Sequence, residues 1–203
     1  MADGLRFGPL TQSTVHLCVD MQRMFAAGSA WQSPWVERTL PTIVRLAERS
    51  PERTVFTRFI PPIDGRDMPG MWQTYYARWP TMTRRHLDDS QIELLPGLAR
   101  LAPPAFVVDK TTYSAFSAPA LPQWLAQHRV DGLIVTGAET DVCILSTVLA
   151  AVEFGYRVIV VTDGVCSSSD DTHDALLTLY HRRFSEQIEA AAADEVLDAW
   201  PPA

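Results

Sequence analysis

The chain has 203 residues, a formal net charge of -7 and a hydrophobic fraction of 47%, which predict one α/β domain spanning residues 1–203. The acidic balance disfavours a nucleic-acid partner, because phosphate backbones are bound by clustered Lys and Arg. No apolar run approaches the roughly 20 residues of a membrane span, and the start of the chain does not resemble a secretory signal. We therefore expect a cytoplasmic protein with no membrane partner.

The first elements are predicted to be strand, helix and strand. An apolar run over residues 15–20 ends in Asp20, apolar residues at helical spacing cover 39–48, and a β-prone run over 54–59 carries Arg58 near its end. Two strands joined in this way are parallel, and open parallel sheets bind ligands at their carboxyl edge. Asp20 could be a functional acid at this edge or a turn or cap residue, and Arg58 could pair with an acidic substrate or form a structural salt bridge.

Residues 61–96 are too long for a simple connection, and we expect an insertion that acts as a lid or as a subunit interface. Its aromatic residues Trp72, Tyr75, Tyr76 and Trp79 occur at helical spacing. Such a stripe belongs more often to a core or a subunit contact than to a substrate pocket.

The second half of the chain continues the alternation of strands and helices. A third strand at 106–109 leads directly into Lys110, and a fourth at 133–136 is broken by Gly137, after which Thr140 or Asp141 can cap a helix that contains Cys143. The remaining elements are a helix at 122–128, a strand at 157–162, a helix at 170–184 and an edge strand at 187–190. This order predicts a doubly wound, mostly parallel sheet with helices on both faces.

The three cysteines, Cys18, Cys143 and Cys166, are odd in number and lack Cys-x-x-Cys spacing, so we expect reduced thiols rather than disulfides or a zinc site. Cys143 differs from the other two because it lies at the start of a predicted helix. Unpaired N–H groups and the helix dipole at that place would make its thiol easier to ionise. The alternative is a small cysteine buried beneath the helix.

Asp20, Lys110 and Cys143 follow three different strands of one parallel sheet, so the fold can bring them together. A thiol can attack an electrophilic carbon, an acid can move the proton to the leaving group, and a cation can stabilise the developing charge. Each residue type therefore meets one requirement of a covalent hydrolysis.

The stretches DMQ at Asp20, VVDKTTYSAF around Lys110 and GAETDVCI at Cys143 resemble the isochorismatase-like cysteine hydrolase superfamily over nearly the whole chain. The resemblance implies a three-layer α/β/α fold, an Asp-Lys-Cys triad, and hydrolysis of an amide or related C–N bond through a thioester-type intermediate. It also implies a homo-oligomer. A cis bond is implied between Ala138 and Glu139, with an oxyanion hole built from the turn of residues Ala138, Glu139, Val142 and Cys143.

Two positions depart from the family pattern. Relatives that bind zinc, such as nicotinamidases, carry Asp-x-His after the second strand, whereas RFIPPIDGRD here contains no histidine, so no metal and no cofactor are expected. Glu139 stands where relatives often have Thr. Its acid could select a cationic or hydrogen-bond-donating substrate, or it could point outward.

Location alone suggests the walls of a substrate pocket. The candidates are Phe25, Arg58, Trp79, Tyr113, Phe116 and Glu139. Two other functions stay open beside amide hydrolysis: vinyl ether hydrolysis of the isochorismatase type, which can proceed without the cysteine, and a non-catalytic binding or scaffold protein on the same fold.

Overall fold

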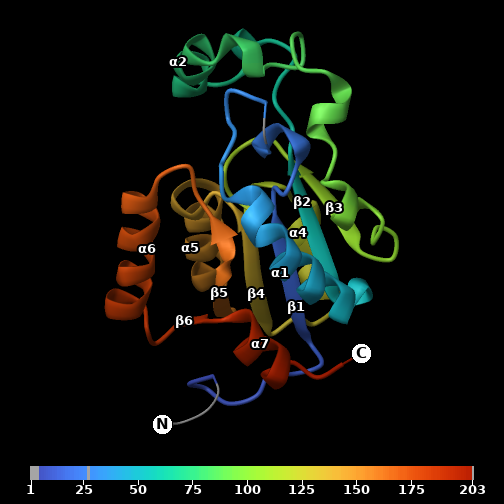
Figure 1. The fold of residues 1–203 in the computed structure, drawn as a ribbon, viewed down its shortest axis with the longest axis vertical. Coiled ribbons are helices and arrows are strands. Elements are labelled where there is room, and N and C mark those ends of the chain that lie inside the picture. Colours follow the sequence, from blue (N-terminus) through green and yellow to red (C-terminus); the bar gives the residue numbers. More distant parts are fainter. Residues whose placement is uncertain (1–4, 27, 203) are drawn as a thin grey trace.

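The structure is a computed structural model that describes residues 5–26 and 28–202. Six parallel strands form one sheet in the order β3-β2-β1-β4-β5-β6 (Figure 1). Their bounds are Thr14–Val19 for β1, Thr54–Phe59 for β2, Phe106–Lys110 for β3, Gly132–Ala138 for β4, Arg157–Cys166 for β5 and Ile188–Ala191 for β6. The strand order reverses between β1 and β4, which is where doubly wound sheets open a crevice at their carboxyl edge.

Helices cover both faces of the sheet, so the predicted three-layer fold is confirmed (Figure 1). α1 (Val36–Arg49), α3 (Pro96–Ala99) and α7 (Ala193–Ala199) pack on one face, and α4 (Ala120–Gln127), α5 (Leu145–Glu153) and α6 (Asp170–Arg183) pack on the other. The alternation along β1 explains both contacts. Val15, Leu17 and Val19 join the core beneath α4 and α5, whereas Cys18 joins the core beneath α1.

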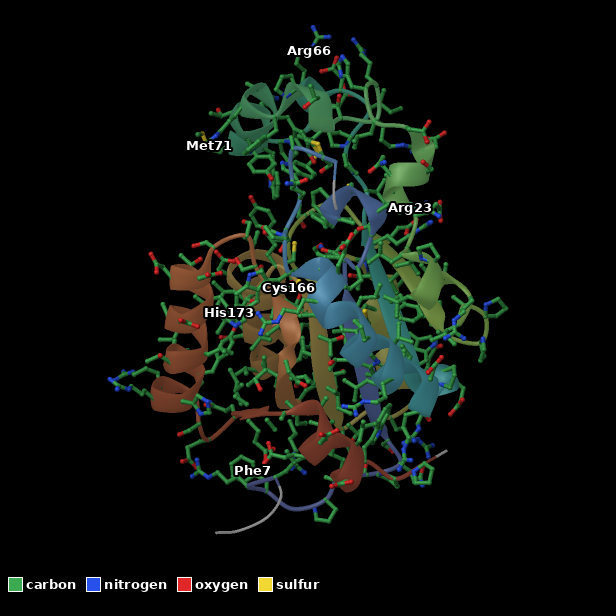
Figure 2. All side chains as sticks on the ribbon, viewed as in Figure 1. Phe7, Arg23, Arg66, Met71, Cys166 and His173 are labelled. Atoms are coloured by element: carbon green, nitrogen blue, oxygen red, sulfur yellow. The ribbon has the colours of Figure 1, made fainter. Side chains whose placement is uncertain are left out.

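The insertion after β2 contains α2 (Met71–Arg78) and lies above the carboxyl edge of the sheet (Figure 1). Figure 2 shows Arg66 and Met71 at its outer edge, while Cys166 lies at the end of β5. Short 3-10 helices occupy Arg23–Phe25, Pro51–Arg53, Gly65–Asp67, Pro80–Met82, Asp89–Ile92 and Ala115–Ser117. Within the described residues, no helix has the length and apolar character needed to cross a membrane.

Several details differ from the sequence prediction. α3 and α7 were not predicted, β4 continues through Gly137 to Ala138 rather than breaking at Gly137, and β5 extends to Cys166 rather than ending at residue 162. The turn after β4 is one π-helical turn at Thr140–Ile144, which precedes α5. Thr140 and Asp141 do not cap that helix, because their side chains bond elsewhere: Thr140 Oγ1 lies 2.8 Å from His173 Nδ1, and Asp141 accepts bonds from residues 167 and 172.

Candidate active site

Asp20 lies directly after β1 and is completely buried. Its backbone has a φ of 53°, a left-handed conformation that Asp tolerates better than most side chains. Three bonds with Thr57 of the neighbouring strand hold it: the N–H of Asp20 donates to Thr57 O at 3.2 Å and to Thr57 Oγ1 at 3.1 Å, and Thr57 Oγ1 donates to Asp20 Oδ1 at 2.6 Å. The carboxylate therefore has a fixed direction before any ligand binds.

Lys110 ends β3 and reaches across β2 toward Asp20. Its Nζ lies 2.6 Å from Asp20 Oδ2, donates to Thr112 O at 3.0 Å and lies 5.0 Å from the centre of the Phe59 ring. Burial lowers the pKa of Lys110, but Asp20 and Cys143 outweigh burial and raise the pKa above its ordinary value. The side chain therefore remains an ammonium ion beside the carboxylate.

Cys143 lies in the turn that follows β4, and Asp20 and Lys110 are near enough to its thiol to influence its pKa. Only 6% of the residue is exposed. Burial raises the pKa of the Cys143 thiol, and the opposing effect of Lys110 is smaller. This direction is opposite to the one expected from the start of a helix, and its largest cause is burial.

The turn that carries Cys143 is folded around the carbonyl of Glu139. The peptide bond between Ala138 and Glu139 is cis. The N–H groups of Val142 and Ile144 both donate to Glu139 O at 3.0 Å. The N–H of Val142 is therefore occupied and does not serve as an oxyanion donor, which corrects one member of the expected set.

A cavity of about 290 Å³ opens above Cys143 at the carboxyl edge of the sheet. Six of the sequence candidates line it: Phe25, Trp79, Tyr113, Glu139, Val142 and Cys143. The other lining residues are Ala30, Trp31, Gln32, Phe59, Tyr75 and Ser168, none of which was singled out as a pocket residue. Tyr75 and Trp79 belong to the insertion of residues 61–96. The insertion therefore forms part of the roof of this cavity.

Two candidates for substrate binding lie elsewhere. Arg58 is held by Asp109 through bonds of 2.8 and 2.9 Å and by Glu93 at 2.9 Å, so it forms the structural salt bridge that was the alternative. Phe116 stacks on Phe154 with 5.0 Å between ring centres, and neither ring lines the cavity. Both predictions were wrong for the same reason. The residues that contact Arg58 and Phe116 come from segments distant in sequence, and a local pattern does not reveal them.

Thr57 and Gln22 are site residues that the sequence did not single out. Thr57 positions Asp20, as described above. Gln22 is fully buried, and its amide accepts a bond from Phe59 N at 2.7 Å while donating to Phe59 O at 3.0 Å and Ile92 O at 2.7 Å. The one signal for Gln22 in the sequence was its position two residues after Asp20. Thr57 had no such signal, because strand pairing decides which residues lie beside the carboxylate.

The segment after β2 does not fit a metal ion. Asp64 is paired with Arg66 at 2.6 Å and with Arg85 at 3.1 Å, so its carboxylate is already neutralised. Across residues 5–26 and 28–202, no three His, Cys, Asp or Glu side chains cluster closely enough to hold a metal.

A three-layer α/β/α fold with a buried thiol, acid and ammonium at its switch point is the architecture of an α/β hydrolytic enzyme. The model of the Isochorismatase domain matches residues 14–192, and the chain belongs to this family of hydrolases.

Comparison with known proteins agrees with this assignment. The nicotinamidase of Escherichia coli is 27% identical over 91% of this chain and 95% of its own length. The N-carbamoylsarcosine amidase of Arthrobacter sp is 28% identical over 66% of this chain and 51% of its own length. The crystal structure of a cysteine hydrolase from Pseudomonas syringae pv. phaseolicola 1448A is similar over 98% of both chains, with a TM-score of 0.77 and 25% identity.

Proposed function

We propose that this protein hydrolyses a C–N bond of a small amide, ureido or carbamoyl compound through a thioester on Cys143, without a metal ion. The observation that carries the proposal is the position of Cys143 in the wall of a cavity of about 290 Å³, near the buried ion pair of Asp20 and Lys110, which both influence the pKa of its thiol. The similarity to amidases supports the choice of a C–N bond.

In the first half of the reaction, Cys143 Sγ attacks the carbonyl carbon while Asp20 takes the thiol proton. A base at this place is required because burial raises the pKa of the thiol. The tetrahedral intermediate then collapses: the C–N bond breaks, and Asp20 gives its proton to the leaving nitrogen. Ammonia or an amine departs and a thioester remains.

In the second half, water attacks the thioester and Asp20 takes a proton from that water. The C–S bond breaks, the carboxylic acid leaves, and the sulfur recovers its proton from Asp20. Lys110 stays charged throughout. It therefore stabilises the ionised form of Asp20, and it stabilises the negative charge on sulfur when the C–S bond breaks. The N–H of Cys143 and those near Glu139 are the proposed donors to the oxyanion.

A screen of ammonia release across small amides, ureido acids and carbamoyl compounds tests the proposal. Cys143→Ala is expected to lower kcat/KM at least about 1,000-fold, because nucleophile loss removes the covalent route. Cys166→Ala is the matched control: its thiol is fully buried, burial raises its pKa to about 11, and it does not line the cavity. Intact mass after rapid quenching should show the acyl-enzyme with wild type and not with Cys143→Ala.

Two results would contradict the proposal. Full turnover by Cys143→Ala would favour hydrolysis of the vinyl ether type, which does not need the thiol. Absence of turnover, together with equally slow reaction of all three cysteines with iodoacetamide, would favour a binding or scaffold protein. Under the proposal, Cys143 reacts first because it alone among the three thiols lines the cavity.

A further inference from the structure

The walls of the cavity are mainly aromatic. The six rings that line it are Phe25, Trp31, Phe59, Tyr75, Trp79 and Tyr113. Trp31 is central to this set, because its ring centre lies 6.2 Å from that of Phe25 and 5.9 Å from those of Phe59 and Tyr75. The faces of aromatic rings are electron-rich and attract cations, so rings grouped around a small volume favour a positively charged guest.

The charge around this volume is negative. Among the lining residues that the structure describes, Glu139 is the one acidic side chain, and there is no Lys, Arg or His. Lys110 lies below, but its charge is matched by Asp20 at 2.6 Å. The guanidinium of Arg78 lies 5.5 Å from the ring centre of Trp79, on an exposed side chain that does not line the cavity.

Glu139 is held in a way that leaves part of its carboxylate for a ligand. One oxygen accepts a bond from the backbone N–H of Ser168 at 2.9 Å, and the half-buried side chain lines the cavity, where a ligand can reach the carboxylate. Burial raises the pKa of this carboxyl group, so a lone carboxylate is costly at this place. A cation bound in the cavity would offset that cost.

We propose that the substrate carries an alkylammonium group, which Glu139 and the aromatic rings bind while its amide or ureido carbonyl faces Cys143. This inference rests on the proposed function for the reaction itself. Glu139 and Cys143 line the same cavity, whose volume is at the lower end of the about 300–1,000 Å³ of small-molecule sites, so both groups belong to one compact molecule. Anionic amides are excluded by the same carboxylate.

The test uses pairs of amides that share a shape and differ in charge. Each pair is an ω-trimethylammonio amide and its tert-butyl analogue, with one to three methylene groups before the carboxamide. Wild type is expected to prefer the cationic member in kcat/KM by about 2- to 30-fold, the range for a cation held against aromatic rings. Glu139→Gln should remove most of this preference, which is read as the ratio of the two amides within each enzyme so that any general effect of the substitution on turnover cancels.

Binding separates this inference from the proposed function. Trp31 and Trp79 line the cavity, so quenching of tryptophan fluorescence in Cys143→Ala measures binding of the same amides without turnover. Tighter binding of the cation that is lost in Cys143→Ala/Glu139→Gln supports the inference even where no amide is hydrolysed. Equal binding and equal kcat/KM of both members overturn it, while hydrolysis that needs Cys143 would leave the proposed function standing.

A second pair of variants guards against misfolding of Glu139→Gln. Tyr75 lies in α2 on the roof of the cavity and is partly exposed. Tyr75→Leu removes the ring and should weaken binding of the cation more than binding of the neutral amide, whereas Tyr75→Phe keeps the ring and should weaken it less. Equal losses for both members with Tyr75→Leu would contradict a role of the ring in binding charge.

Discussion

Asp20 and Lys110 form an ion pair whose side chains are both fully buried, with 2.6 Å between Oδ2 and Nζ. Two charges removed from water are costly unless each is well paired, and loss of one partner typically costs about 3–5 kcal/mol. The pair is therefore weak evidence for stability and better evidence for a site. Its direction is set by Thr57, which donates to the carboxylate and also lies in the neighbouring strand.

Thr57→Val keeps the shape of the side chain and removes the donor to Asp20 Oδ1. We expect kcat to fall about 10-fold or more, because a hydrogen bond to a charged group contributes about 1.5–3 kcal/mol. KM should change little, since Thr57 does not line the cavity. Thr57→Ser restores the hydroxyl and should restore most of kcat. A Val variant as fast as wild type would show that Thr57 does not position the acid.

Glu139→Gln should stabilise the protein more at pH 7 than at pH 4. Burial raises the pKa of Glu139 above its ordinary 4.5, so the folded protein holds this proton more tightly than the unfolded chain does. Its contribution to stability is complete below pH 4.5 and is lost as pH rises through the folded pKa. Urea unfolding of both proteins at the two pH values measures the difference, and an equal effect at both would contradict the raised pKa.

Among the elements, the end of β4 shows how closely the strands must approach at the switch point. Gly137 has a φ of 116°, and a Cβ built on it would lie 2.0 Å from Val19 O in β1. Glycine is required here both for the backbone conformation and for the contact. The close approach brings the turn that carries Cys143 beside the end of β1, where Asp20 follows.

Gly137→Ala should therefore lower the free energy of unfolding by about 3 kcal/mol or more. Strain at the positive φ and a clash with the backbone of β1 both destabilise the folded state, and the two costs add up. Gly155→Ala is the matched control. Its φ is 82°, but nothing lies within 4 Å of the added carbon, so it should cost only the about 1–2 kcal/mol of a left-handed residue. Equal losses for both variants, measured by urea unfolding, would show that the approach of β1 and β4 is not tight.

At the scale of the whole molecule, α7 and the start of β1 lie at the end of the sheet opposite to the insertion that contains α2 (Figure 1). Trp200 follows α7, is fully buried, and donates from Nε1 to Thr14 O at 3.1 Å at the start of β1. Arg53 lies over its ring at 4.7 Å. The chain end thus closes the amino edge of the sheet, away from the cavity.

Trp200→Ala should cost about 3–5 kcal/mol of stability, as for other large buried side chains, with kcat/KM near the wild-type value at temperatures where the protein is folded. Phe154→Ala serves as the comparison, because Phe154 is 60% exposed and its loss should stay within about 1 kcal/mol. Loss of activity in folded Trp200→Ala would show that the two ends of the sheet are coupled.

The homo-oligomer implied by the family stays a prediction, which light scattering of the purified protein tests.

The strand positions could be predicted because each is a short β-prone run, and Asp20, Lys110 and Gly137 lie at or next to the ends of three of them. The proposed catalytic residues followed from the same pattern, since parallel strands deliver their carboxyl ends to one edge. The cavity walls could not be predicted in the same way. Trp31 lies in a loop without periodicity, and Tyr75 faces the cavity because the insertion folds back over the sheet.

By itself, the sequence determined the doubly wound sheet and placed Asp20, Lys110 and Cys143 at strand ends, because hydrophobic periodicity and turn residues act locally. The tertiary structure alone decided the properties that depend on neighbours. In the folded protein, Asp109 forms a salt bridge with Arg58, aromatic rings surround the cavity, and burial raises the pKa of the Cys143 thiol. Burial, strand pairing and the path of the insertion set these environments, and none of them is encoded in a short stretch of chain.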